Sequence, residues 1–277
     1  MATVKKWLTS ALIILLVSVP CMAQSTILPK TTVLPKTTAI GGKNVPVAYV
    51  SAASGNTVSG TTTCVLTKTF TSGQLLLAFV FTADYTDNVS AITSTVSDGV
   101  NTWTQFSTSP FTDSTNTTKS TYWWTKPASG STTVTFTNTS STPYIACYIV
   151  AYTSSTGWKS SPVDQQATAN IAVTSLGVCA TTTTLSSGTT SATAQASELV
   201  VGLLGISLTN SSTPAQTYAG SGGYTERLSL SNSGQGGEVV DLTTTTTGAQ
   251  TATGTLCVAS SASNTGGNGV VVTMMPN

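Results

Sequence analysis

The chain has 277 residues, of which 7% are charged and 39% hydrophobic, with no histidine and a formal net charge of +1 at pH 7. Charge is far below that of an ordinary soluble domain, but the apolar content is too high for a disordered chain, so a folded core is expected. The lack of histidine excludes mechanisms that need imidazole as base, proton shuttle or metal ligand. The even balance of charge excludes a basic surface for nucleic acid.

Residues 1–23 have the pattern of a secretory signal peptide. Two lysines precede an apolar run over residues 8–19, which a proline ends and which is too short to span a bilayer. Cys21 and Ala23 occupy the small-residue positions before a cut that makes Gln24 the first mature residue. We therefore expect an exported protein with no transmembrane span once the signal is removed.

Residues 24–44 are expected to form an extended linker. They contain the hexapeptide Ile-Leu-Pro-Lys-Thr-Thr at 27–32 and a close copy, Val-Leu-Pro-Lys-Thr-Thr, at 33–38. Proline at this spacing favours a solvated, extended chain, which indicates a tether. The alternative is an arm whose apolar pairs add a strand to a neighbouring subunit, as in donor-strand assembly.

Residues 45–277 are expected to form one all-β domain, an antiparallel β-sandwich of jelly-roll or Greek-key type. Short runs rich in Val, Ile, Thr, Tyr and Phe alternate with Gly, Ser, Asn and Pro about every ten residues. Four nearly continuous apolar runs predict strands that are covered on both faces, namely residues 75–81, 144–152, 199–206 and 270–275. In residues 133–137 the alternation predicts Val134 and Phe136 in the core and threonines facing water.

A similarity between two segments of the chain supports that arrangement. A strand that begins at Cys64 leads through a turn at Ser72 and Gly73 into the run at 75, and a strand that begins at Cys179 leads into the run at 199. The two segments are therefore predicted to be related hairpins.

The order of several short motifs resembles a known type of domain. The motifs are Ser-Asp-Gly-Val-Asn-Thr-Trp at 97–103, Tyr-Trp-Trp at 122–124, Thr-Val-Thr at 133–135, Ser-Pro-Val-Asp at 161–164 and Glu-Leu-Val-Val-Gly at 198–202. They resemble the secreted jelly-roll-like β-sandwich domains of bacterial cell-surface and extracellular proteins. The resemblance implies a fold and an extracellular location, and it implies no activity.

Four cysteines remain after removal of the signal, and an even number in an exported protein predicts disulfides. Because Cys64 and Cys179 occupy analogous strand starts, and Cys147 and Cys257 both lie in later apolar strands, we expect the pairs 64–179 and 147–257. Four buried free thiols are the alternative.

Large aromatic side chains are the candidates for ligand contact: Tyr122, Trp123, Trp124, Trp103 and Trp158. An exposed aromatic ring presents a flat apolar face with a polar tip, which suits a sugar ring or a protein partner. Strand alternation places Trp123 on the opposite face from its neighbours. Packing in the core is the competing role for all five.

Loop acids suggest calcium rather than catalysis. Asp84, Asp87 and Asn88 supply the oxygen ligands that Ca²⁺ takes in flexible numbers, although no EF-hand spacing is present. No other cofactor is indicated. No pair of the nine acidic residues stands out as the acid and base of a hydrolase, so we expect no enzyme.

The sequence as a whole predicts a secreted or cell-surface, non-catalytic adhesion or binding module, with extracellular carbohydrate or another surface polymer as its partner. The alternative is a structural subunit that forms a homopolymer, an extracellular filament or matrix, through residues 24–38.

Overall fold

The computed structural model describes residues 47–57, 61–84, 88–128, 130–140, 144–172, 182–208, 216–232, 235–258 and 264–277. These residues belong to one compact unit, Lys43–Asn277. The predicted signal peptide and linker lie outside the described residues. Within the described part the protein is all-β, with a single 3₁₀ turn, η1 (Val89–Ala91), and it contains no helix with the length and hydropathy to cross a membrane.

The strands divide into two halves, residues 47–154 and 158–276. The first half contains β1 (Val47–Thr57), β2 (Thr63–Phe70), β3 (Leu75–Ala83), β4 (Ser94–Ser97), β5 (Thr104–Gln105), β6 (Phe111–Thr112), β7 (Thr118–Thr125), β8 (Ser131–Asn138) and β9 (Tyr144–Ser154). The second half contains β10 (Trp158–Asn170), β11 (Thr183–Ala192), β12 (Leu199–Leu208), β13 (Gln216–Gly220), β14 (Thr225–Asn232), β15 (Gln235–Thr243), β16 (Ala249–Val258) and β17 (Asn264–Pro276).

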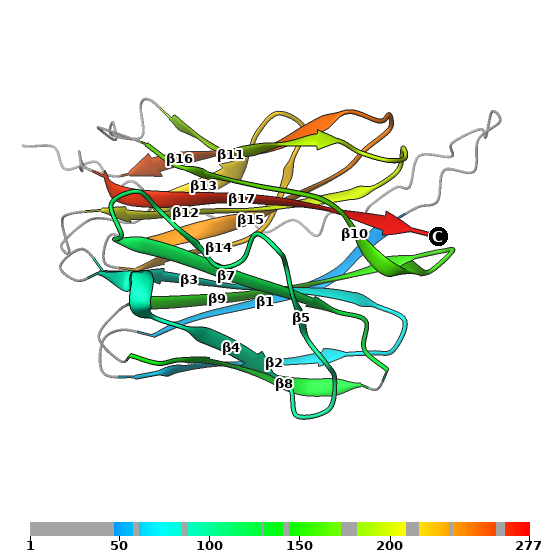
Figure 1. Ribbon diagram of the computed structural model, residues 1–277, viewed down its shortest axis with the longest axis horizontal. Helices are drawn as coiled ribbons and strands as arrows, with labels where there is room; N and C mark the ends of the chain where they lie inside the picture. Colours follow the sequence, from blue (N-terminus) through cyan, green and yellow to red (C-terminus); the bar gives the residue numbers. More distant parts are fainter. Residues whose placement is uncertain are drawn as a thin grey trace, which may run out of the picture. The chain divides into compact units, whose positions relative to one another are not determined.

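Each half forms two antiparallel sheets. The first inner sheet has the order β1-β9-β3-β7-β5, with β6 also on β7, and the first outer sheet has the order β2-β8-β4. The second inner sheet is β10-β17-β12-β15-β14, and the second outer sheet is β11-β16-β13. Figure 1 shows them stacked, with the two inner sheets between the two outer sheets.

Three apolar clusters fill the spaces between these layers. One joins the two inner sheets, and the other two each join an inner sheet to its own outer sheet. The central inner strands β3, β9, β12 and β17 therefore bury both faces, which explains their continuous apolar sequence. All residues of β3 and of β12 are buried, and so are residues 144–152 and 270–274. The predicted buried runs are confirmed, except that Met275 is only half-buried, but they lie in the two inner sheets of a four-sheet stack where the sequence predicts a single sandwich.

The outer sheets show the opposite pattern, because only one of their faces is covered. On β8 the side chains of Val134 and Phe136 are buried, whereas Thr133 and Thr137 are exposed, as predicted. On β11 and β16 the exposed hydroxyls of Thr189 and Thr251 lie opposite each other and bond at 2.7 Å. Hydroxyl groups rather than charges therefore cover these faces.

The two halves pair their strands in the same way. In the first half β1 lies beside β9, β2 beside β8 and β3 beside β7; in the second, β10 lies beside β17, β11 beside β16 and β12 beside β15. The turn before each central strand is closed alike, since Gln74 Oε1 accepts from Thr71 N at 3.0 Å and Glu198 Oε1 accepts from Gln195 N at 3.1 Å. The similarity between the two segments of the sequence therefore reflects two halves with a common strand order.

The halves face each other as the two subunits of a symmetric dimer do. The Arg227 guanidinium of β14 lies 4.5 Å from the ring centre of Tyr49 on β1. At the other edge, the Thr108 hydroxyl, which follows β5, donates to Gln166 of β10 at 3.0 Å. Each half thus places its first strand against the region of the fifth strand of the other half.

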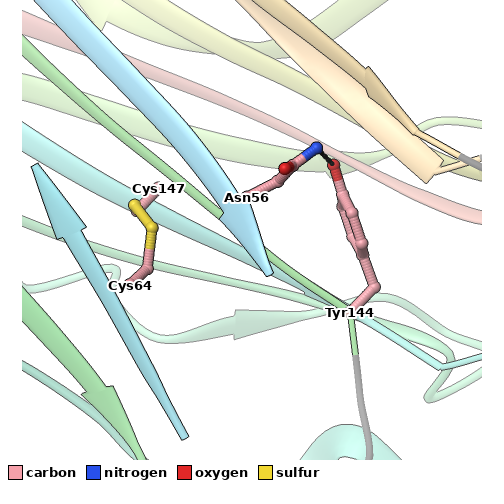
Figure 2. The surroundings of a disulfide bond; sticks show 4 residues. All are labelled: Asn56, Cys64, Tyr144 and Cys147. Atoms are coloured by element: carbon pink, nitrogen blue, oxygen red, sulfur yellow. Dashed lines mark hydrogen bonds between the residues drawn. A yellow bond between two sulfur atoms is a disulfide. The ribbon is translucent and has the colours of Figure 1, made fainter. Parts of the chain in front are cut away.

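The disulfide pairing predicted from the sequence is wrong. Cys64 of β2 is bonded to Cys147 of β9, and Figure 2 shows this bond between the first outer and first inner sheets, near the hydrogen bond from Asn56 to the Tyr144 hydroxyl. Cys147 faces the first outer sheet, whereas Cys257 lies on the second outer sheet, at the far side of the stack. Matched positions in a repeated fold are far apart, so they cannot pair.

Cys257 is also disulfide-bonded. Its partner lies outside the described residues, as does Cys179. The alternative of four free thiols is therefore excluded by both observed bonds.

Candidate functional site

A hollow of about 340 Å³ opens at the end of β7, at one edge of the first inner sheet. Its lining comes from β5, from the end of β7 and from the loops that precede and follow them: Val100, Asn101, Thr102, Thr104, Trp124, Thr125, Lys126 and Ala128. The lining combines one aromatic ring, hydroxyl groups and a single cation. A predicted ligand-contacting aromatic, Trp124, thus borders a hollow together with polar side chains.

Strand alternation decides which aromatic of β7 reaches the hollow. Tyr122 points into the cluster between the inner sheets, and Trp123 points the other way, into the cluster beneath the first outer sheet. Trp124 lies on the same side as Tyr122 but near the strand end, beside the two-residue strand β5, where Thr104 is its partner. Because so short a strand cannot cover the ring, Trp124 stays half-buried.

The turn that follows β4 shapes the rim of the hollow. The Asp98 carboxylate accepts from Val100 N at 3.1 Å, Asn101 N at 2.8 Å and Asn101 Nδ2 at 2.7 Å. Asn101 Oδ1 in turn accepts from Ala128 N at 3.0 Å, which ties the rim to the loop after β7. Burial alone raises the pKa of Asp98, but these hydrogen bonds outweigh it and lower the pKa overall, so the carboxylate stays charged and engaged in the turn.

Lys126 supplies the positive charge of the lining. Its Nζ donates to the backbone carbonyl of Lys159 at 2.7 Å, which holds the side chain but leaves its charge unneutralised. The ion pair found among the described residues joins Arg227 to Asp241. Thr102 and Thr104 are exposed beside Lys126 and offer hydroxyl groups at the mouth of the hollow.

The other predicted aromatic contacts pack in or against the apolar clusters. Trp158 is 7% exposed and packs between the inner sheets, while the hydroxyl of the fully buried Tyr122 bonds Thr108 Oγ1 at 2.5 Å. Trp103 is half-buried against the cluster beneath the first outer sheet. Of the five aromatic candidates, Trp124 is the one that lines this hollow.

The residues predicted to bind calcium are only partly described. Asn88 Oδ1 accepts from Ser90 N at 2.8 Å and caps η1, Asp84 is 8% exposed, and Asp87 lies outside the described residues. No group of three or more acidic, cysteine or histidine side chains suited to a metal ion occurs in the described part of the chain. The calcium site remains a prediction.

Two glutamates in the second half are fully buried. Burial, together with the neighbouring Asp164 carboxyl, raises the pKa of Glu198 to about 7. Burial, helped by the negative charge of Glu226, raises the pKa of Glu238 to about 9, and neither carboxyl oxygen of Glu238 has a hydrogen-bond partner. Because both side chains are 0% exposed, neither can touch a ligand that arrives from solvent.

Sequence reasoning identified Trp124 but not the polar residues around it. No sequence motif contains Lys126, Thr102 or Thr104 as a binding residue. Only their positions could have indicated them, because the two threonines follow Asp98-Gly99 and the lysine follows the Tyr-Trp-Trp segment. No family model, curated protein or solved structure matches this chain. The geometry of the hollow is therefore the basis for a functional proposal.

Proposed function

We propose that this protein is a secreted or cell-surface, non-catalytic binding module that holds a carbohydrate in the hollow at Trp124. The observation that carries the proposal is the position of one half-buried tryptophan ring beside exposed threonines and a lysine, in a hollow of about 340 Å³. A volume of this order is at the lower end of the range of small-molecule sites.

The chemistry of the lining suits a sugar ring. An aromatic face packs against the apolar C–H face of a pyranose, while hydroxyl side chains donate to and accept from its hydroxyl groups. Trp124 is held by packing against the cluster between the inner sheets, so its ring is fixed before a ligand arrives. A pre-positioned ring lowers the entropy cost of binding.

The strand order supports the jelly-roll form of the fold. In each half the first strand lies beside the last, the second beside the last but one, and the third beside the next strand inward. A long hairpin rolled into two facing sheets gives this order. The proposed protein is thus two jelly rolls in tandem, packed through their inner sheets.

The buried Cys64–Cys147 disulfide supports an oxidising, extracellular location, together with the signal-peptide pattern of residues 1–23. The location is tested by expressing the full chain with its leader in an exporting bacterial host. Mature protein that begins at Gln24 and is found outside the cytoplasm agrees with the proposal, and an intact leader retained inside the cell contradicts it.

Binding is tested with a panel of immobilised polysaccharides. The mature protein should be retained by at least one of them, and Trp124→Ala should weaken retention by about tenfold or more, the loss expected for one well-packed aromatic contact. Tyr49→Ala is the matched control, because Tyr49 is a half-buried aromatic at the opposite edge of the same sheet. Retention that survives Trp124→Ala rejects this hollow as the site.

The filament subunit is the second candidate, and one observation favours it. Residues 24–38 precede β1, which lies at an edge of the first inner sheet, and an edge strand is where an added strand pairs. Deletion of residues 24–38 distinguishes the two. Full-length protein that assembles, while the shortened protein stays monomeric, supports the filament; equal size in solution supports the binding module.

A further inference from the structure

Resting on the proposed function, we propose that the ligand in the hollow is an acidic polysaccharide, and that Lys126 binds a carboxylate group of its sugar. Neutral glucans share the pyranose ring but lack that group. The proposal therefore distinguishes two classes of ligand for the same hollow.

The burial and hydrogen bonding of Lys126 support this proposal. Its side chain is half-buried, and its ammonium donates to a backbone carbonyl, which is a polar group without net charge. An ammonium group has three donors, so two remain for a ligand. A cation that is partly removed from water without an anionic partner costs free energy, which an anionic ligand recovers.

The charges around the hollow leave Lys126 as the group that meets a ligand. Asp98 is the acidic residue of the rim, and its oxygens accept three hydrogen bonds within its own turn. The Lys159 ammonium donates to Gln195 Oε1 at 3.1 Å. Neither side chain is part of the lining, whereas Lys126 is.

The geometry of the lining also fits a sugar acid. Trp124 and Lys126 are two residues apart, and both border the hollow together with Thr102 and Thr104. A sugar packed on the indole ring thus has an ammonium group and hydroxyl groups within the same space. A carboxylate on the sugar forms a charge-assisted hydrogen bond with the ammonium, the stronger class of hydrogen bond.

Overall charge offers no general attraction for polyanions. Outside residues 1–23, eight basic residues stand against nine acidic residues. Binding of an acidic polymer therefore needs a local site, and nonspecific electrostatic binding is expected to be weak.

The test uses affinity electrophoresis of the mature protein through gels that contain polygalacturonate, alginate or the neutral glucan dextran. We expect retardation by a uronate polymer but not by dextran. Lys126→Gln should weaken the uronate interaction about tenfold, as the loss of one charge-assisted contact does, and Lys126→Arg should largely preserve it. The interaction should also weaken when salt is raised, because charges at a half-exposed site are screened.

Lys68→Gln is the matched control, since Lys68 is a half-buried lysine on the first outer sheet. Equal losses in Lys126→Gln and Lys68→Gln mean nonspecific attraction and overturn the proposal. Binding to dextran that Trp124→Ala abolishes and Lys126→Gln leaves intact overturns the acidic ligand but keeps the carbohydrate site. No binding to any of these polymers or to the wider panel overturns both.

Discussion

The two halves share one strand order but fill it with different side chains. Trp158, Tyr218 and Tyr224 are the aromatic residues of the second half, whereas the first half contains all six phenylalanines of the chain in addition to tyrosines and tryptophans. The first half joins its sheets through Cys64 and Cys147, and the second buries two glutamates. The pattern of strand pairing thus tolerates large changes in core chemistry, as long as the central strands β3, β9, β12 and β17 remain apolar on both faces.

The position that matches Trp124 in the second half has different chemistry. Trp124 is paired with Leu77 and Thr104, and Asp241 occupies the matched position of the second half, paired with Val201 and Thr225. Asp241 accepts from Arg227 Nε at 2.7 Å, and Arg227 covers Tyr49. In the second half, an ion pair and a cation–π contact thus cover the edge at β14. In the first half, the edge at β5 leaves the Trp124 ring beside the hollow.

The largest difference should come from the disulfide of the first half. Replacing Cys64 and Cys147 by serine removes a crosslink between residues separated by 83 positions. The chain-entropy model predicts a loss of about 4.5 kcal/mol in the free energy of unfolding, measured by urea denaturation. A loss below about 1 kcal/mol would show that the first half does not depend on its crosslink.

Peptide mapping under non-reducing conditions checks the pairing itself. It should recover Cys64 linked to Cys147, and Cys257 linked to a different peptide. After signal removal Cys179 is the remaining cysteine, so we expect it in that peptide. Recovery of a 64–179 or 147–257 crosslink contradicts the layered arrangement.

The contact between the halves should respond to a single methyl group. A Cβ on Gly205 would lie 2.5 Å from the Phe81 ring, which fills the space between the inner sheets. Gly205→Ala should therefore cost about 1–3 kcal/mol of unfolding free energy, as overpacking does. Adding Phe81→Leu should recover part of that loss, and strictly additive losses would show that the two residues are not in contact.

Glu238 should make the second half sensitive to alkali. Its pKa of about 9 in the folded protein exceeds the ordinary value of 4.5, so its contribution is complete below pH 4.5 and is lost as pH rises through about 9. Thermal unfolding should show a melting temperature that falls between pH 6 and 9. Glu238→Gln, which keeps the shape, should flatten that dependence.

The position that matches Glu238 in the first half is Thr121, which has no titrating group. Glu238 pairs with Leu204, and Thr121 pairs with Val80 at the matched position of the first half. Thr121→Ser should leave the pH dependence of the melting temperature unchanged. A wild-type melting temperature that is flat or rises from pH 6 to 9 argues against a neutral, buried Glu238.

The smallest effect is expected at the turn after β4, which differs from its match in the second half. The turn after β4 is held by the Asp98 carboxylate, whereas the turn after β13 contains Gly222 and Gly223 with φ of 62° and 91°. Asp98→Ala should cost about 1 kcal/mol, the value of a typical hydrogen bond, measured by urea denaturation. Because its pKa is lowered, the stability that Asp98 adds is lost as pH falls, so the variant and the wild type should converge in acid.

The sequence predicted the elements whose chemistry is periodic. The continuous apolar run at 75–81 predicted a strand buried on both faces, and the alternation around Val134 predicted a strand buried on one face. Burial on both faces requires apolar residues at every position, whereas burial on one face requires them at every second position. The turn at Ser72 and Gly73 was also predicted, and Gly73 has a positive φ of 81°.

What the sequence did not predict depends on contacts between distant segments. The order in which the sheets stack decides that Cys147 faces the first outer sheet, and no local sequence pattern indicates that order. The alternation of β7 separated Trp123 from Trp124, but the half-exposure of Trp124 depends on the shortness of β5, which lies elsewhere in the chain. The hydrogen bond of Lys126 likewise depends on a distant segment, because its carbonyl partner, Lys159, lies on β10.

The central claim is that a sugar packs on Trp124, and the indole N–H signals in a nitrogen–proton correlation spectrum test it most directly. Titration with oligogalacturonate, with the signals assigned from Trp124→Phe, should shift the Trp124 indole signal and leave those of the buried Trp123 and Trp158 in place. A saturating shift of Trp124 agrees with the account. The account is contradicted if no saccharide that binds the protein shifts an indole signal, or if the Trp103 signal alone shifts.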